Sequence, residues 1–80
     1  MIHINSDMTQ YTRADLDMAD RHIAEGEEHI GRQEVLLSEL RVRGQPLESA
    51  EALLALFNST QASHITHRAA IVRALEAEGL

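Results

Sequence analysis

The stretch that decides the fold is LRVRGQPLESAE, residues 40–51. Gly44 stands where a left-handed residue commonly ends a helix, and Pro46 follows shortly after it. Because proline is well tolerated in the first turn of a helix, a second helix can begin at or just after Pro46. A connection this short forces the two helices to run antiparallel. The segment therefore predicts an all-α hairpin with helices at about residues 12–43 and 46–78.

The segment before this turn repeats apolar or small residues at alternating intervals of three and four, a pattern typical of a helix that packs along one face. These positions are Leu16, Ala19, Ile23, Gly26, Ile30, Gln33, Leu37 and Leu40. Thr12 and Asp15 are three residues apart and resemble an N-terminal capping box, with Asp in place of Glu. The first helix should therefore begin near Thr12.

Counting outward from the turn assigns facing residues on the two helices. The expected pairs are Leu16 with Leu75, Ala19 with Ile71, Gly26 with His64, Gln33 with Phe57 and Leu40 with Ala50. The pairs near both ends are apolar, whereas those in the middle contain polar residues. We therefore expect a hairpin that is apolar at its ends and polar in its middle.

A single hairpin leaves several apolar residues without cover, among them Val35, Leu36, Leu56 and Val72. Burying such surface stabilises an assembly by about 25 cal/mol per Å2. A symmetric homodimer is the commonest closed assembly. We therefore expect two hairpins to pair as an antiparallel four-helix bundle.

Composition narrows the class of protein. The chain of 80 residues is one small domain at most, with residues 1–11 expected to be a flexible tail and residues 12–80 to form the hairpin. Thirteen acids against seven bases give a net charge of −6, which disfavours binding to nucleic-acid phosphates. The chain has no cysteine, which excludes disulfides and thiolate metal sites.

Membrane association is also not expected. No stretch approaches the roughly 20 apolar residues that cross a bilayer. The N-terminal residues have neither the basic nor the apolar region of a signal peptide. These features predict a cytoplasmic protein.

Four histidines are the candidate functional residues. His22 and His29 are seven apart, and His64 and His67 are three apart. Imidazole is a ligand for Zn, Ni and Cu, and bundle cores hold metals between facing helices. His64 and His67 could share one ion, with His22 or His29 joining from the facing helix or from a second subunit. One hypothesis is therefore a transition-metal-binding or sensing bundle that uses His22, His29, His64 and His67.

The competing interpretation needs no cofactor. The same histidines could form a buried polar layer that fixes the register of the helices, as single polar residues do in coiled coils. Their hydrogen-bond partners would be Gln33, Thr60, Gln61, Glu27 or Arg68. The sequence leaves both interpretations open.

An enzyme is not expected. Ser59, Thr60 and Ser63 lie near histidines in the sequence, but a nucleophile also needs an oriented base and an oxyanion site, which bare helices rarely provide. By exclusion, the leading hypothesis is a protein–protein interaction or assembly module with an unidentified protein partner.

Two segments of the sequence are also similar to those of a known group of proteins. ADRHIAEGEEHIGRQ, followed after the turn by AEALLALFNSTQASHITHRAAIV, resembles a group of short uncharacterised helical-hairpin proteins of soil alphaproteobacteria. These share an RHI-x-x-G-E-x-HI segment and a later H-x-x-HR, and the similarity covers about residues 14–75. The group has no assigned activity. The resemblance therefore implies a cytoplasmic helical protein and no catalytic residues.

Overall fold

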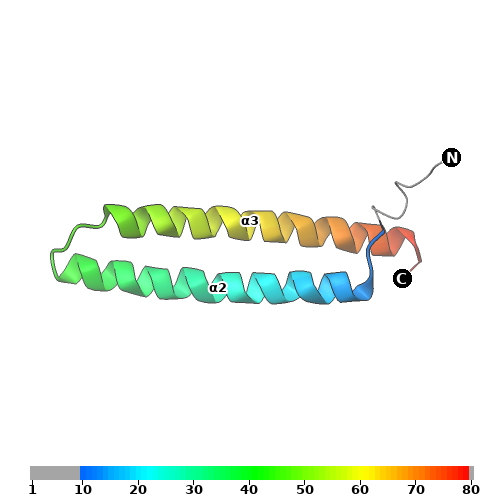
Figure 1. Ribbon diagram of the computed structural model, residues 1–80, viewed down its shortest axis with the longest axis horizontal. Coiled ribbons are helices and arrows are strands. Elements are labelled where there is room, and N and C mark those ends of the chain that lie inside the picture. The colour runs from blue at the N-terminus through cyan, green and yellow to red at the C-terminus, as the bar shows by residue number, and fades with distance from the viewer. Residues whose placement is uncertain (1–9, 80) are drawn as a thin grey trace.

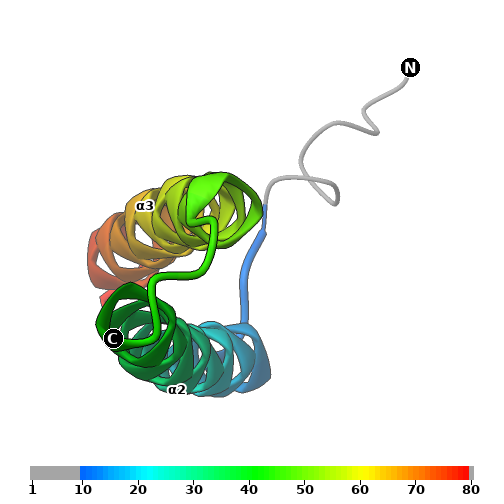
Figure 2. The ribbon, with the colours of Figure 1, turned by 90° about the vertical axis from the view of Figure 1, so that its left-hand side faces the viewer.

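The computed structural model describes residues 10–79 as a hairpin of two antiparallel helices (Figure 1). The helices are α2 (Arg13–Val42) and α3 (Glu48–Ala77), each of 30 residues and hence about 45 Å long. Seen from the turn, they lie side by side with no third element against them in the described part of the chain (Figure 2). The predicted all-α hairpin is confirmed. Residues 1–9, most of the predicted tail, lie outside the described residues.

The turn closes as the sequence predicts. Gly44 adopts a left-handed φ of +70°, and its N–H donates to the Arg41 carbonyl at 3.2 Å. The N–H of Gln45 donates to the Leu40 carbonyl at 2.9 Å. This pair of bonds is a Schellman motif, which satisfies carbonyls that the end of a helix leaves free. Because only glycine adopts this φ without strain, Gly44 fixes where α2 ends.

The other helix boundaries agree within two residues. Thr12 caps α2, and the capping box with Asp15 is formed in both directions: the Asp15 N–H donates to Thr12 Oγ1, and the Thr12 N–H donates to Asp15 Oδ2. The start of α3 differs slightly from the prediction. The Glu51 N–H donates to the Leu47 carbonyl at 2.8 Å, so helical bonding begins after Leu47, and Pro46 lies before the helix rather than in its first turn.

The core between the helices is thin. Its buried apolar residues are Ala19, Leu37, Ala50, Ile71 and Leu75. At the open end, Ala19, Ile71 and Leu75 form one cluster, against which Leu16 and Tyr11 pack. The predicted pairing of apolar residues at this end is therefore confirmed. Tyr11, which the sequence assigned to the tail, belongs to the packed structure.

The middle of the hairpin is polar, as expected, but its register differs from the prediction. Gln33 and Gln61 are both buried. Gln33 Nε2 donates to the Ala50 carbonyl at 3.0 Å, and Gln61 Nε2 donates to the Ile23 carbonyl at 2.9 Å. The expected pairing of Gln33 with Phe57 is therefore wrong, whereas the pairing of Leu40 with Ala50 stays a prediction. A glutamine reaches along the facing helix to a backbone carbonyl, which counting by Cα positions does not anticipate.

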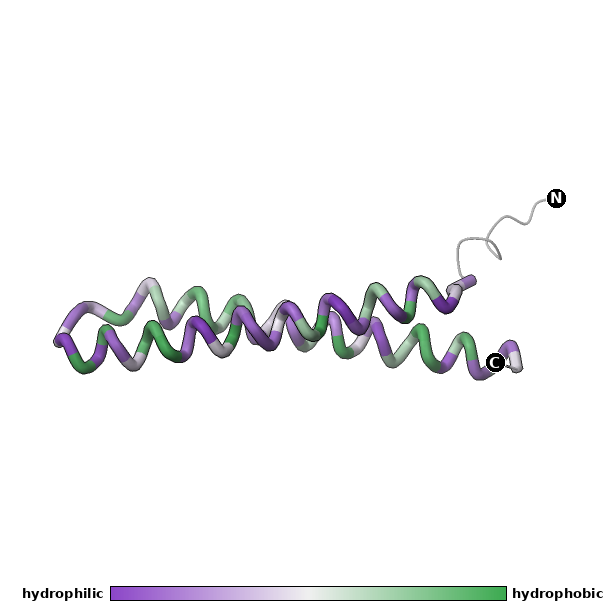
Figure 3. Tube along the Cα trace, turned by 90° about the horizontal axis from the view of Figure 1, so that it is seen from below, coloured by the Kyte–Doolittle hydropathy of each residue, from purple (hydrophilic) through white to green (hydrophobic). Residues whose placement is uncertain are grey.

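Many large apolar side chains remain exposed on the hairpin. They are Met18, Val35, Leu36, Val42, Leu53, Leu56 and Ile65. Colouring by hydropathy shows apolar positions alternating with polar ones along both helices instead of gathering in one block (Figure 3). Within residues 10–79, neither helix is long and apolar enough to cross a membrane.

Candidate functional site

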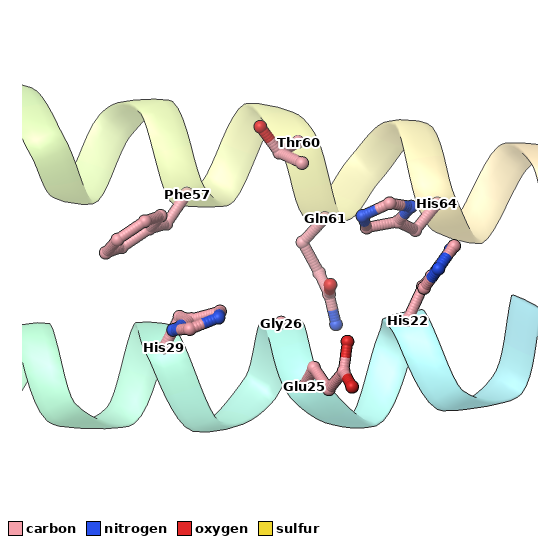
Figure 4. A pocket seen from close by; sticks show the side chains of 8 residues that line it. All are labelled: His22, Glu25, Gly26, His29, Phe57, Thr60, Gln61 and His64. Carbon is pink, nitrogen blue, oxygen red and sulfur yellow. The ribbon is translucent and has the colours of Figure 1, made fainter.

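A pocket of about 130 Å3 opens between the helices at the middle of the hairpin. Figure 4 shows the residues that line it, which are His22, Glu25, Gly26 and His29 of α2 and Phe57, Thr60, Gln61 and His64 of α3. Three of the four histidines singled out from the sequence therefore meet at one place.

Gly26 leaves room for the Gln61 side chain in the pocket lining. A Cβ on this residue would lie 1.8 Å from Gln61 Oε1, so any larger residue would push the Gln61 side chain away. The expected pairing of Gly26 with His64 is wrong, because the amide of Gln61 takes the space that the sequence assigned to an imidazole. Gln61 crosses from α3 to α2 here, as Figure 4 shows.

His22 and His64 form the first ring contact of the site. Their ring centroids are 5.2 Å apart, with an angle of 44° between the planes. His22 is exposed and His64 is half-buried. Two imidazoles from facing helices therefore lie close together at the end of the pocket nearer the open end of the hairpin (Figure 4).

His29 and Phe57 form the second contact, seven residues nearer the turn on each helix. Their rings are stacked, with centroids 5.4 Å apart and 24° between the planes. Nη2 of Arg32 also lies 3.5 Å from His29 Nδ1. The single phenylalanine of the chain thus closes the other end of the pocket.

His67 lies outside the pocket. Its ring packs edge-to-face on Tyr11, with centroids 5.7 Å apart and a plane angle of 79°. The two histidines of the SHITH segment therefore point to different surroundings. Within residues 10–79, no group of three or more His, Asp or Glu side chains is placed to hold a metal ion. One hairpin thus offers the pair His22 and His64, and not the four-histidine set of the metal hypothesis.

The buried polar layer is made by glutamines. His22, His29 and His67 are exposed, whereas Gln33 and Gln61 are buried and donate across the hairpin. Oε1 of Gln61 is buried and accepts no hydrogen bond within the described part of the chain. An amide flip would not help, because Oε1 would then face the Ile23 carbonyl, another acceptor. The site thus contains one unsatisfied buried acceptor.

An ion pair marks the opposite edge of the hairpin. Arg68 Nε donates to Asp20 Oδ1, and both side chains are about half exposed. Asp20 and His22 are two residues apart, so they point about 200° apart around α2. The histidine pocket and this ion pair therefore lie on different faces of the molecule.

The pocket lining contains side chains that can act as metal donors. Imidazole nitrogens and the Glu25 carboxylate are donors for borderline metals such as Zn, Ni and Cu. The hydroxyl of Thr60 also lines the pocket, but none of the side-chain hydrogen bonds in residues 10–79 links it to an imidazole, as an activated nucleophile requires.

Comparisons with known proteins add no assignment. No protein-family model matches the chain, and no curated protein or solved structure shows significant similarity to it. The resemblance to short alphaproteobacterial hairpin proteins therefore stays an expectation.

Proposed function

We propose that this protein is a non-catalytic assembly module that pairs with a second copy as a four-helix bundle. The observation that carries the proposal is an imbalance within residues 10–79, where five apolar residues are buried and seven large apolar side chains are left exposed. A pair of 30-residue helices buries only one stripe of each. Exposed apolar side chains that cluster on one face of a protein commonly mark an interaction site.

Four of the seven exposed apolar residues lie on the same face as the pocket, whereas Val35, Val42 and Ile65 lie elsewhere. We define the histidine face by Met18, His22, His29 and Leu36 of α2 and by Leu53, Leu56, Phe57 and His64 of α3. His22, His29 and Leu36 are spaced by seven, so they share one side of α2. The ring contacts to His64 and Phe57 place that side next to the matching side of α3.

Charge supports association through this face. The chain carries a net charge of −6, so two copies repel unless their acids point away from the contact. Asp20, Glu27 and Glu34 are spaced by seven along the other edge of α2, where Asp20 pairs with Arg68. Glu25 is the one carboxylate that lines the pocket. The histidine face therefore lies away from the acidic row formed by Asp20, Glu27 and Glu34.

A second copy suits this face better than an unrelated protein. The two helices are equal in length, so two hairpins stacked on their histidine faces can overlap along their full length. Every neighbouring pair of helices is then antiparallel, which is the ordinary geometry of a four-helix bundle. Stable dimers bury about 800 Å2 on each partner, an area that two helices of about 45 Å can provide.

Light scattering tests the proposal. The full chain at micromolar concentration should show twice the monomer mass of 8.9 kDa. Leu36→Glu should shift the mass toward the monomer, because it places a charge in the interface. Val42→Glu is the matched control, since Val42 is 88% exposed and lies about 120° around α2 from Leu36. A wild-type chain that is monomeric at micromolar concentration would contradict the proposal.

A further inference from the structure

We propose that the dimer holds a transition-metal ion at the pocket, with His22 and His64 of one copy as two ligands and imidazole from the second copy completing the site. This inference rests on the proposed assembly. In place of four histidines from one chain, the ligands are His22 and His64 of one copy together with imidazole of the second copy, and His67 takes no part.

The separation of the two rings fits a shared ion. Zinc binds imidazole nitrogen at about 2.0–2.1 Å, and its four ligands point to the corners of a tetrahedron. Two rings bound in this way have their centres about 5 Å apart. The observed separation of the His22 and His64 centroids is 5.2 Å. Sharing an ion requires the two side chains to rotate until a nitrogen of each points to a common position, and His22 is exposed.

One hairpin cannot complete the site. Structural zinc sites take four protein ligands, and sites with an open position take three. Residues 10–79 of a single chain contain no placed group of three. A second copy must therefore supply what is missing, which makes the ion a bridge between subunits.

The position of the pocket meets this requirement. Gly26 is the fourteenth residue of α2, and Gln61 is the fourteenth residue of α3, out of 30 in each. The pocket therefore lies at the middle of the hairpin. Any two-fold arrangement that overlaps the hairpins over their full length brings one pocket onto the other.

The two possible arrangements both supply imidazole. If the turns lie at the same end, His22 and His64 of the second copy face His22 and His64 of the first. If the turns lie at opposite ends, His29 of the second copy faces them instead, because the His29–Phe57 contact lies on the other side of the pocket centre (Figure 4).

The remaining lining suits a hydrated metal ion. Gln61 is 8% exposed and its Oε1, which lies against Gly26, accepts no hydrogen bond in the described residues, so the lining carries an unsatisfied polar atom. The carboxylate of Glu25 supplies negative charge. Imidazole donors select Zn, Ni or Cu over Mg or Ca.

Titration of the untagged, metal-free chain with Zn2+ tests the inference. The expected result is saturable binding with one ion for each two chains if the turns share an end, or one for each chain if they do not. His64→Ala and His22→Ala should each weaken binding by at least about tenfold. His67→Ala is the matched control and should bind like the wild type, since its ring packs on Tyr11 outside the pocket.

A fourth variant, His29→Ala, reports how the two hairpins are arranged. His29→Ala should weaken binding only if the turns lie at opposite ends, and either result is consistent with a site shared between copies. Circular dichroism and light scattering of each variant without metal establish that it still folds and dimerises. Protons compete with metal for imidazole nitrogens, so binding should also weaken as the solution is made acidic.

Failure of this inference is distinct from failure of the proposed assembly. A metal-free dimer that does not bind Zn2+, or that loses binding equally in His67→Ala and His64→Ala, overturns the metal site and leaves the dimer intact. A chain that is monomeric with and without Zn2+ overturns both. A monomer that binds Zn2+ through His22 and His64 alone overturns the bridging role.

Discussion

The open end and the middle of the hairpin use the same two helices in different ways. At the open end, Ile71 is 1% exposed and packs with Ala19 and Leu75. In the middle, Gln61 is also buried, but it reaches α2 through a hydrogen bond to the Ile23 carbonyl and fits only because Gly26 has no side chain. The comparison teaches that the apolar end supplies stability, whereas the polar middle fixes register and keeps a pocket.

The largest expected effect is at the open end. Ile71→Ala removes the most deeply buried side chain and should lower the free energy of unfolding by about 2–4 kcal/mol, the usual range for such truncations. Ile65→Ala is the control, because Ile65 is 53% exposed and should change stability much less. Urea unfolding at one fixed protein concentration measures both, since dimerisation makes stability depend on concentration. Equal losses in the two variants would contradict the assignment of stability to the open end.

The next effect is in the middle. Gly26→Ala should destabilise the fold by about 1–2 kcal/mol, because the new methyl group displaces the Gln61 amide and its hydrogen bond. Gly31→Ala is the matched control: its Cβ meets nothing within 4 Å, and alanine should stabilise the helix by up to about 1 kcal/mol. Both are measured by urea unfolding.

A double variant sharpens this result. Gln61→Ala removes the side chain with which the methyl group of Gly26→Ala would clash. The double variant should therefore be more stable than Gly26→Ala alone. A non-additive cycle of this kind is the signature of direct contact. If the two changes are simply additive, Gly26 and Gln61 do not act together.

A smaller effect is expected at the cap of α2. Thr12→Ala should cost about 1 kcal/mol, because it removes the side-chain acceptor for the Asp15 N–H. Thr12→Ser keeps that acceptor and should restore most of the loss. Thermal unfolding followed by circular dichroism distinguishes the two, and equal losses would mean that the hydroxyl group does not contribute.

The smallest effect concerns the ion pair on the edge opposite the pocket. Asp20 and Arg68 are 50% and 42% exposed, so solvent screens their attraction. Asp20→Asn should change stability by no more than about 0.5 kcal/mol, and added salt should reduce the difference further. A loss above about 1 kcal/mol would place this pair among the main determinants of the fold.

Much of the fold was predictable from local rules. Gly44, Thr12 and the spacing of Leu16 and Ala19 predict the turn, the cap and the apolar end, because each depends on backbone geometry or on side chains too short to reach another partner. The middle was harder to predict. The Gln61 side chain extends past the residue that faces it, and Phe57 contacts His29 instead of Gln33. Long side chains can contact residues up to a helical turn away from the position that faces them, so counting positions does not identify their partners.

The candidate site was predictable in part. The sequence indicates that histidines gather in the middle, and His22, His29 and His64 do line one pocket. It does not separate His64 from His67, since that depends on where the ring of Tyr11 lies. Residues three apart on a helix point about 60° apart, enough to place one inside a pocket and the other outside.

A distance between two copies tests the central claim most directly, namely that the histidine face is covered by a second hairpin. The chain has no cysteine, so a spin label on Arg43→Cys, at the exposed turn, is unique. Pulsed electron resonance should show dipolar coupling between two labels, at short range if the turns share an end or beyond about 45 Å if they do not. Dilution with unlabelled chain should reduce the coupling. A sample at micromolar concentration with no coupling between labels would contradict the account.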